Sequence, residues 1–455
     1  MRTLVEILFV LFFIYTLVYF CQLFFGLCVS IYRFSKSPKK KLYIKRLFPN
    51  HVLHAVPVSV IVPAYNEAAC ICNTIDSLLN EDYPNLEILV VNDGSTDHTE
   101  KLLVNHYKMV REEFSYTPEL ATKPVRNCYS KQFADKTLRF ICKDNGGKSD
   151  ALNCGLNFCS NALCVIIDAD TRIQKGSIQV MASHFIMDNQ VIVCAGSVNG
   201  NNNDFQNLSI FHKILVLFQK LEYYRTFYLQ RIVFDHLNAN IVVSGAFAMF
   251  RSDLLKKIGG YKVDTIGEDM ELTMRLHAFC ASQKFDYHIA YAPEAKCITQ
   301  FPFTYKDFYR QRLRWHIGMI QSMYSHRYML GKLFYGWAGI ISGTYVFFYE
   351  FFAPFIEIIG LLTLLAANLL NILDLKFTLS AMLTYSIFII LIQTVHAKAI
   401  DIYKIDRVDF TQHLMLLLIS IVEIIFFHPF NTVIKLIAFF KRKRHQKRWD
   451  HIKRI

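Results

Sequence analysis

The sequence lacks the closely spaced cysteines and histidines that structural zinc sites require. Its twelve cysteines are scattered, only Cys70 and Cys72 are near each other, and no Cys-x-x-Cys/His set is present. Because zinc ligands normally occur as such sets, the sequence does not support a zinc site. We expect the cysteines to be reduced thiols, many of them in the core of a mostly cytoplasmic chain.

The N-terminal segment also lacks the features of a cleavable signal peptide, which has a shorter apolar core and a cleavage site of small residues. Its apolar run from Leu4 to Ile31 is longer than the roughly 20 residues that cross a bilayer. Hydrophobic residues make up 53% of the 455 residues, which is too apolar for one soluble domain. We therefore expect residues 1–32 to be a transmembrane anchor.

Acidic residues are nearly absent from two segments that lie beside the apolar regions. Residues 33–46 contain seven Lys and Arg and no acid, and residues 441–455 contain eight with Asp450 alone. Each segment carries a charge of +7, so the rest of the chain, whose total is +13, sums to −1. Basic residues beside membrane helices mark the cytoplasmic face and contact anionic lipid. We therefore expect a lipid bilayer, and no nucleic acid, as the partner of these charges.

A second apolar block spans residues 336–440. Breaks near Ala353–Pro354, at 371–376 and at 398–410 predict about four transmembrane helices. Both basic segments should be cytoplasmic, and an even number of crossings between them meets this condition. Three carboxylates fall inside the block: Glu350, Glu357 and Glu423. They either line a pathway, since intramembrane carboxylates are costly and often functional, or lie near helix ends.

Residues 56–330, between the apolar regions, alternate strand-like and helix-like patterns. Apolar runs at 58–62, 86–91, 138–142 and 163–167 predict strands, with helical spacing between them, whereas residues 105–137 are polar and predict an irregular surface excursion. This alternation predicts an α/β domain with a mostly parallel sheet and helices on both faces. Ligands of such sheets bind at the carboxyl ends of the strands. The polar residues at these ends are Tyr65, Glu67, Asp93, Asp168 and Asp170.

Two of these residues, Asp168 and Asp170, follow the apolar run 163–167. Alternate residues of an extended chain point the same way, so their carboxylates converge on one spot. Two oxygen donors suit Mg²⁺ or Mn²⁺, whose remaining ligands are usually water and substrate phosphates. A lone Asp-x-Asp is more often a solvated turn. Here four other segments of the chain occur in the order expected around it, which favours a metal site.

Six motifs occur in order along the chain. They are VSVIVPAYNE at 58–67, VNDGSTD at 91–97, GKSDALN at 147–153, DAD at 168–170, GED at 267–269 and QRLRW at 311–315. Together they resemble the family 2 glycosyltransferases, and in particular the membrane-embedded branch with cellulose, hyaluronan, chitin-oligosaccharide and poly-N-acetylglucosamine synthases. The resemblance covers residues 56–318 and implies a GT-A nucleotide-sugar-binding domain inserted between transmembrane helices.

The resemblance implies a role for each polar residue of the predicted cleft. Asp168 and Asp170 would hold Mg²⁺ or Mn²⁺ between the phosphates of the donor. Lys148 could instead be a simple turn lysine, and Asp93 could cap a helix. The residues implied in nucleotide-sugar binding are Tyr65, Glu67, Asp93, Lys148 and Asp168.

Asp269 is implied as the general base, near the start of a helix. The alternative is a carboxylate that is stabilised by the helix dipole. Many relatives have Thr-Glu-Asp here and this chain has Gly267, but the chitin-oligosaccharide and hyaluronan enzymes also carry Gly, so the base role is retained. The residues implied in acceptor or product binding are Glu268, Gln311, Arg314 and Trp315. Arg314 and Trp315 would also suit a helix at the membrane interface.

Two further segments are placed by pattern and resemblance. Residues 244–250 match the acceptor-side strand of the family, and residues 208–235 are amphipathic, aromatic and basic. The latter pattern predicts a helix that lies on the membrane beneath the active site. We expect the basic segment 33–55 to be a juxtamembrane linker and residues 441–455 to be a cytoplasmic tail.

The expected function is that of an inverting glycosyltransferase in the inner or plasma membrane, multi-pass, with a cytoplasmic catalytic domain. It would use a UDP-sugar, either UDP-N-acetylglucosamine or UDP-glucose, to extend a β-linked glycan, with coupled export and an accessory export protein as a candidate partner. The alternative is a non-processive transferase that acts on a glycolipid acceptor in the membrane.

Overall fold

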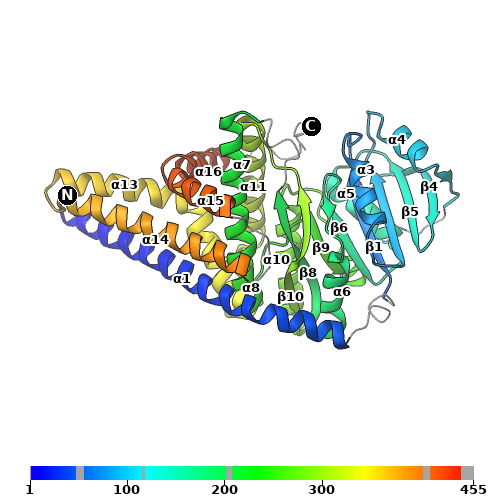
Figure 1. Ribbon diagram of the computed structural model, residues 1–455, viewed down its shortest axis with the longest axis horizontal. Helices are drawn as coiled ribbons and strands as arrows, with labels where there is room; N and C mark the ends of the chain where they lie inside the picture. The colour runs from blue at the N-terminus through cyan, green and yellow to red at the C-terminus, as the bar shows by residue number, and fades with distance from the viewer. Residues whose placement is uncertain (1, 48–55, 115–117, 201–207, 403–409, 442–455) are drawn as a thin grey trace.

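The computed structural model describes residues 2–47, 56–114, 118–200, 208–402 and 410–441. Figure 1 shows a sheet-containing domain at one end and an arm of long helices at the other. Upright helices, among them α7 and α11, stand between the two parts.

The described strands form one ten-stranded mixed sheet. In order across the sheet they are β3 (Val110–Arg111), β4 (Val125–Phe133), β5 (Lys136–Lys143), β2 (Leu86–Asn92), β1 (Val58–Ala64), β6 (Leu163–Ile167), β9 (Phe247–Arg251), β8 (Val191–Gly200), β10 (His288–Thr299) and β7 (Arg172–Ile173). The four strands β5, β2, β1 and β6 are mutually parallel. Strand β9 is antiparallel to both of its neighbours. The predicted α/β domain is confirmed, and parallel pairing is concentrated in the half of the sheet that contains β1.

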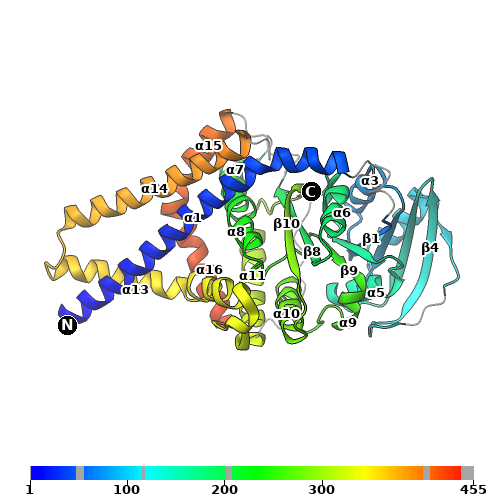
Figure 2. The same ribbon diagram turned by 90° about the horizontal axis from the view of Figure 1, so that it is seen from below.

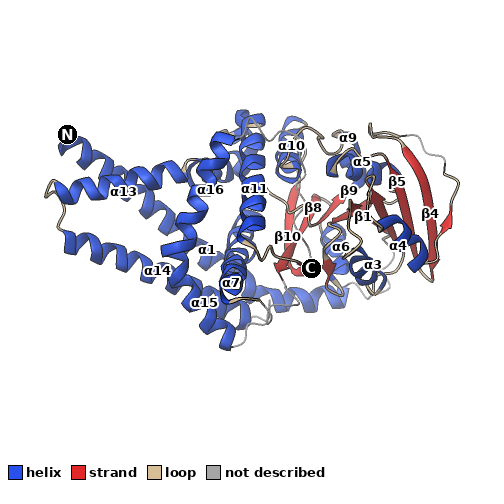
Figure 3. Ribbon diagram, turned by 90° about the horizontal axis from the view of Figure 1, so that it is seen from above, coloured by secondary structure: helices blue, strands red, loops and turns tan. Residues whose placement is uncertain are grey.

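Helices cover both faces of this sheet, as predicted. The helices of the domain are α3 (Ile71–Leu79), α4 (Thr99–His106), α5 (Lys148–Phe158), α6 (Ser177–Met187), α9 (Ser252–Lys257) and α10 (Glu268–Ser282). Helices α3 and α6 lie on one face, and α5, α9 and α10 lie on the other (Figures 2 and 3).

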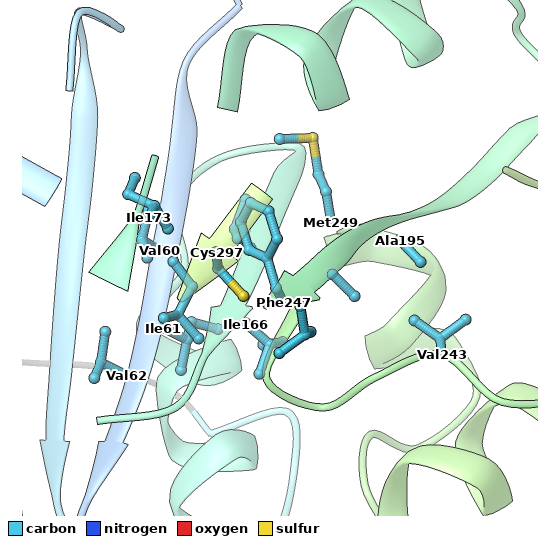
Figure 4. Packing of buried hydrophobic residues seen from close by; sticks show 14 of the residues in the cluster. Val60, Ile61, Val62, Ile166, Ile173, Ala195, Val243, Phe247, Met249 and Cys297 are labelled. Carbon is cyan, nitrogen blue, oxygen red and sulfur yellow. The ribbon is translucent and has the colours of Figure 1, made fainter. Parts of the chain in front are cut away.

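The core lies where β1 and its neighbours pack against these helices. Every residue of β1 is buried, which suits a strand covered on both faces. Ile61 of β1 and Ile166 of β6 pack with Phe247 and Met249 of β9 (Figure 4). A Cβ on Gly155 of α5 would lie only 2.3 Å from Cγ2 of Ile61. Glycine therefore allows α5 to lie directly on β1, and this contact sets the position of the loop before α5.

One sequence expectation for this domain is wrong. Residues 105–137 were expected to be an irregular excursion, but they include all of β3 and β4. Strand β4 pairs antiparallel with β5, and β3 pairs antiparallel with β4. Most residues of β4 are only partly buried, because β4 lies next to the sheet edge and the edge strand β3 has only two residues. The polar composition of β4 therefore concealed a strand.

The arm consists of α1 (Arg2–Leu47), α13 (Ala353–Leu369) and α14 (Leu375–Ile402). Helix α1 continues beyond the apolar run into the basic segment, where a linker was expected. Between α11 and α13 lie η3 (Arg327–Met329), η4 (Leu333–Tyr335), η5 (Ala338–Ser342), α12 (Gly343–Tyr345) and η6 (Val346–Phe351). The upright helices are α7 (Ile210–Arg225), η2 (Thr226–Gln230), α8 (Arg231–His236) and α11 (Tyr305–Ser325), and the last helices are α15 (Phe410–Val422), η7 (Glu423–Phe427) and α16 (His428–Lys441).

Among the described residues, 2–36 and 375–402 form helices that are long and apolar enough to cross a membrane. Residues 338–351 and 353–369 form a pair bent by 55°, which would be a third span if it crosses as one unit. The bend falls at the predicted break beside Pro354. These helices agree with a membrane protein, whereas four carboxyl-terminal crossings and the cytoplasmic side of the domain stay predictions.

Candidate active site

The candidate site lies at the carboxyl ends of β1, β2 and β6 and at the amino end of α10. The loop after β1 contains Tyr65 and Glu67, and between them Asn66 has a left-handed backbone with φ of 57°. Its side-chain Oδ1 accepts hydrogen bonds from the backbone N–H groups of Thr96 at 2.7 Å and Asp97 at 3.2 Å. Asn66 therefore ties the loop after β1 to the loop after β2, and sequence reasoning passed over it although it lies inside the first motif.

Asp93, at the end of β2, is buried, and its carboxylate is already surrounded by donors. It accepts hydrogen bonds from the backbone N–H groups of Gly146 at 2.9 Å and Gly147 at 2.7 Å. Lys143 Nζ lies 2.6 Å from Asp93 Oδ1 and 2.6 Å from Asp150 Oδ1. Asp93 thus holds the Gly146–Gly147 loop in place, and its contact with a nucleotide stays a prediction. Lys143 was not singled out from the sequence.

Lys148 begins α5 directly after this loop and connects two parts of the site. Its Nζ lies 2.7 Å from Asp168 Oδ1 and 3.3 Å from Glu268 Oε1. Burial opposes its charged form, but the Asp168 and Glu268 carboxylates outweigh this and hold the pKa of Lys148 above its ordinary value. A cation is therefore fixed between the end of β6 and the start of α10, and the role of Lys148 in nucleotide-sugar binding stays a prediction.

Asp168 and Asp170 follow the last residue of β6, as predicted. The Asp168 side chain is 31% exposed, and Thr171 Oγ1 donates a hydrogen bond to Asp170 Oδ1 at 3.4 Å. Within the described residues, no group of three or more His, Cys, Asp or Glu side chains is arranged to hold a metal ion. A pair of accessible carboxylates still fits Mg²⁺ or Mn²⁺, because substrate phosphates and water complete the coordination of these ions.

Asp269 and Glu268 occupy the first turn of α10, where the helix dipole favours negative charge. Asp269 Oδ2 accepts a hydrogen bond from the backbone N–H of Gly245 at 3.3 Å, and Oδ1 accepts one from Met270 at 2.8 Å. Burial raises the pKa of Glu268; the Asp269 carboxylate raises it further, whereas Lys148 opposes both effects. The two adjacent carboxyl groups therefore have different partners. Glu268 lies beside the Lys148 ammonium, whereas Asp269 accepts backbone N–H groups.

Gly245 lies between the two halves of the site. A Cβ placed on it would be 3.6 Å from Lys148 Nζ and 3.5 Å from Asp269 Cβ. Gly245 belongs to the predicted acceptor-side segment 244–250, most of which forms β9. Sequence reasoning included the segment but not the role of this glycine as a neighbour of both the lysine and the proposed base.

Helix α11 carries Gln311, Arg314 and Trp315 past the same region. Trp315 is 39% exposed, and the guanidinium of Arg312 lies 4.4 Å from the centre of its ring. Arg312 also forms an ion pair with Glu222 of α7 at 2.7 Å. The exposed indole face can receive a sugar ring, while Arg312, which sequence reasoning passed over, fixes the indole and joins α11 to α7.

The structure thus brings together Lys148, Asp168, Glu268 and Asp269, with Gly245 against them. Arg314 is close enough to influence the charge states of Lys148 and Glu268. Asp93 lies on the other side of the Gly146–Gly147 loop, and its link to the cluster runs through that loop. The arrangement offers a cation for phosphate, two carboxylates for a metal and a carboxylate that can accept a proton.

Family comparison agrees with this geometry. Residues 163–400 match the family described as "Glycosyl transferase family group 2", and residues 59–259 match "Glycosyl transferase family 2". The first match covers more than half of the chain. The chain therefore belongs to the family 2 glycosyltransferases, which confirms the resemblance found in its motifs.

Individual relatives are more distant. The poly-beta-1,6-N-acetyl-D-glucosamine synthase of Staphylococcus epidermidis is 29% identical over 261 residues, which cover 57% of this chain and 54% of that protein. The chain thus aligns with about half the length of this relative. A protein named "Probable glycosyltransferase YdaM" from Bacillus subtilis is 27% identical over 362 residues, which cover 77% of this chain and 75% of that protein.

Two solved structures are also similar in part. A mannosyltransferase from Pyrobaculum calidifontis in complex with GDP-Man and Mn²⁺ has a TM-score of 0.48 and 18% identity, covering 88% of this chain and 99% of that chain. S. aureus TarS 1-349 in complex with UDP-GlcNAc has a TM-score of 0.35 and 18% identity, covering 58% of this chain and 67% of that chain.

Proposed function

We propose that this protein transfers N-acetylglucosamine from UDP-N-acetylglucosamine to the end of a β-linked glycan at the cytoplasmic face of a membrane. The observation that carries the proposal is the position of Lys148 between Asp168 and Glu268, because it joins the donor side of the site to the base side. The choice of sugar rests on the relative named as a poly-beta-1,6-N-acetyl-D-glucosamine synthase. UDP-glucose is the other donor that the motifs allow.

The donor side of the site would stabilise the leaving diphosphate. Lys148 Nζ lies beside Asp168 at the end of β6, and its fixed positive charge would face the phosphates. Asp168 and Asp170 would hold Mg²⁺ or Mn²⁺, which supplies further positive charge to the diphosphate when bound. The Gly146–Gly147 loop, whose N–H groups are held by Asp93, would let the backbone approach the nucleotide closely.

The acceptor side would supply the proton transfer. Asp269, oriented by the N–H of Gly245, would accept the proton of the acceptor hydroxyl as that oxygen attacks the anomeric carbon. The new glycosidic bond forms as the bond to the diphosphate breaks. One base without a second catalytic acid suits a single displacement, so the anomeric configuration would invert.

A large cavity beside α11 supports a path for the acceptor into the membrane. Its volume is about 1650 Å³, and it extends from His316, next to Trp315, between α1, α13 and α14. Side chains with polar or charged groups on its wall include Tyr19, Tyr345, Tyr349, Glu350 and Lys435. Aromatic faces with hydroxyl groups suit sugar rings, and the Lys435–Glu350 ion pair, at 2.8 Å, keeps both charges compensated. We therefore propose that export follows this cavity.

A second candidate function is transfer of a sugar to a membrane lipid. It is favoured by the apolar side chains of α1 that line the same cavity, among them Phe9, Phe12 and Phe13. A hydrocarbon tail would fit there with its head group toward His316. The two functions require the same donor site and differ in the length of the product.

The product therefore decides between them. The protein in lipid nanodiscs is incubated with labelled UDP-N-acetylglucosamine, and both UDP release and product length are measured. A ladder of long products supports the synthase, and a single labelled species that extracts into organic solvent supports the lipid acceptor. Absence of UDP release with every sugar nucleotide tested would contradict both.

A further inference from the structure

The loop that precedes α10 contacts the backbone of α11 directly. A Cβ on Gly267 would lie 2.8 Å from the carbonyl carbon and oxygen of Gly318, and a Cβ on Gly318 would lie 2.8 Å from the Cα and N of Gly267. Such distances essentially do not occur in real structures, so either side chain would force the two segments apart. Both positions need glycine because of this contact.

Two side chains of α11 hold the same loop from the next turn. Gln321 Oε1 accepts a hydrogen bond from the backbone N–H of Ile266 at 3.0 Å. Ser322 Oγ donates one to the carbonyl oxygen of Gly267 at 3.3 Å. The segment 266–267 is therefore fixed on both sides of the glycine contact, and it runs directly into Glu268 and Asp269.

Helix α11 carries Trp315 one turn before Gly318. The helix is joined to α7 by the Arg312–Glu222 ion pair and begins with a cap in which the Thr304 hydroxyl accepts the N–H of Asp307 at 3.1 Å. The helix is therefore anchored at its start and middle, and a shift of the loop at 266–267 would move Asp269 relative to Trp315.

We propose that Gly267, Gly318 and Gln321 are positioning residues that fix the base Asp269 at a set distance from the acceptor-binding face of α11. This inference rests on the proposed function of Asp269 and Trp315. A shift of about 1 Å between reacting groups can cost roughly 10²-fold in rate, so the contact would matter for turnover rather than for donor binding. It also accounts for the glycine at position 267, since a Cβ there would meet the backbone of Gly318.

The test compares three substitutions with a control on the same helix. Gly318→Ala should lower kcat for transfer at least tenfold, whereas the KM for UDP-N-acetylglucosamine should stay within about threefold of wild type. Gln321→Leu removes the acceptor for the Ile266 N–H and should lower kcat, and Gln321→Glu keeps an acceptor oxygen and should restore most of it. Ser325→Ala, an exposed position on α11, should behave as wild type.

A second measurement does not depend on which sugar is transferred. Hydrogen–deuterium exchange of the peptide that covers residues 262–270 should be faster in Gly318→Ala and Gln321→Leu than in wild type and Ser325→Ala. Unchanged exchange together with unchanged kcat in both variants would overturn the positioning role. A wild-type protein that does not transfer sugar from any donor, but shows the expected exchange differences, would refute the proposed function and leave the positioning contact standing.

Discussion

Lys143 places its ammonium group 2.6 Å from the Asp93 carboxylate in the interior of the half of the sheet that contains β1. Neither side chain reaches solvent, since their exposed fractions are 0% and 1%. The same ammonium compensates Asp150 at the start of α5. One buried cation therefore joins the end of β2 to the start of α5, and we expect the stability of the proposed donor site to depend on it.

Replacing Lys143 with methionine should destabilise the catalytic domain. The substitution leaves two buried carboxylates without their cation, and breaking a buried pair typically costs about 3 to 5 kcal/mol. The unfolding temperature of the purified protein, followed by intrinsic fluorescence, should fall by several degrees. Lys175→Met is the matched control, because its ion pair with Asp82 is exposed and contributes little. Equal losses in the two variants would contradict a special role for Lys143.

Removing either predicted metal ligand should abolish turnover and leave the fold intact. Asp168→Asn and Asp170→Asn should retain less than about 1% of wild-type transfer, because positive charge on the leaving diphosphate is central to the proposed reaction. Wild-type activity should disappear in EDTA and return with Mn²⁺ or Mg²⁺, measured as UDP release. The control Asp253→Asn removes an exposed carboxylate of α9 and should stay active. Full activity in EDTA would exclude the metal site.

Asp269→Asn separates donor binding from chemistry. The amide is nearly isosteric and can still accept the Gly245 N–H, but it cannot take a proton. Loss of a general base typically costs about 10² to 10⁴ in rate, so kcat should fall by this factor while UDP affinity stays within a few-fold. Glu268→Gln, at the adjacent position, should weaken acceptor binding more than it lowers kcat for transfer. Near wild-type transfer by Asp269→Asn would show that another group is the general base. Glu268 would then be the next candidate.

Glu81 should make stability depend on pH. Burial raises the pKa of this carboxyl to about 7, although a backbone hydrogen bond from Gly176 opposes the shift. Between pH 4.5 and 7 the folded state therefore keeps a proton that the unfolded state has lost, so the free energy of unfolding should decrease as the pH rises through this range.

The substitution Glu81→Gln removes this titration and keeps an oxygen that can accept the Gly176 N–H, which Glu81 Oε1 accepts at 2.8 Å. The variant should exceed wild type by on the order of 1 to 3 kcal/mol above pH 7 and show a flatter pH profile. Thermal unfolding from pH 5 to pH 8 measures both effects. The neighbouring exposed Asp82 adds less than burial to the raised pKa of Glu81, so Asp82→Asn should keep most of the wild-type slope. A wild-type slope in Glu81→Gln would disprove the assignment.

Much of the site followed from short segments of sequence. The apolar runs that became β1, β2, β5 and β6 could be recognised because a buried strand needs only consecutive apolar residues. Asp168 and Asp170 lie directly after such a run, and Lys148 follows two glycines. The long apolar helices at 2–36 and 375–402 were predictable for the same reason, since span length and hydropathy are local properties.

Several features could not be recognised in this way. Strand β4 was missed because a half-exposed strand near the edge of a sheet contains polar residues. The antiparallel insertion of β9 between β6 and β8 leaves no local pattern. The Lys143–Asp93 pair joins residues 50 positions apart, and Gln321 accepts from Ile266 across 55 positions. Nothing in the neighbourhood of either residue indicates its partner.

The sequence by itself indicated the buried strands β1, β2, β5 and β6, the long apolar helices, and the family motifs that the chain carries. The tertiary structure decided that Lys148 lies between Asp168 and Glu268, that Lys143 compensates Asp93, and that Gly267 meets Gly318. The physical reason is that periodicity and propensity act over a few neighbouring residues, whereas these contacts join distant segments and depend on how closely the folded elements pack.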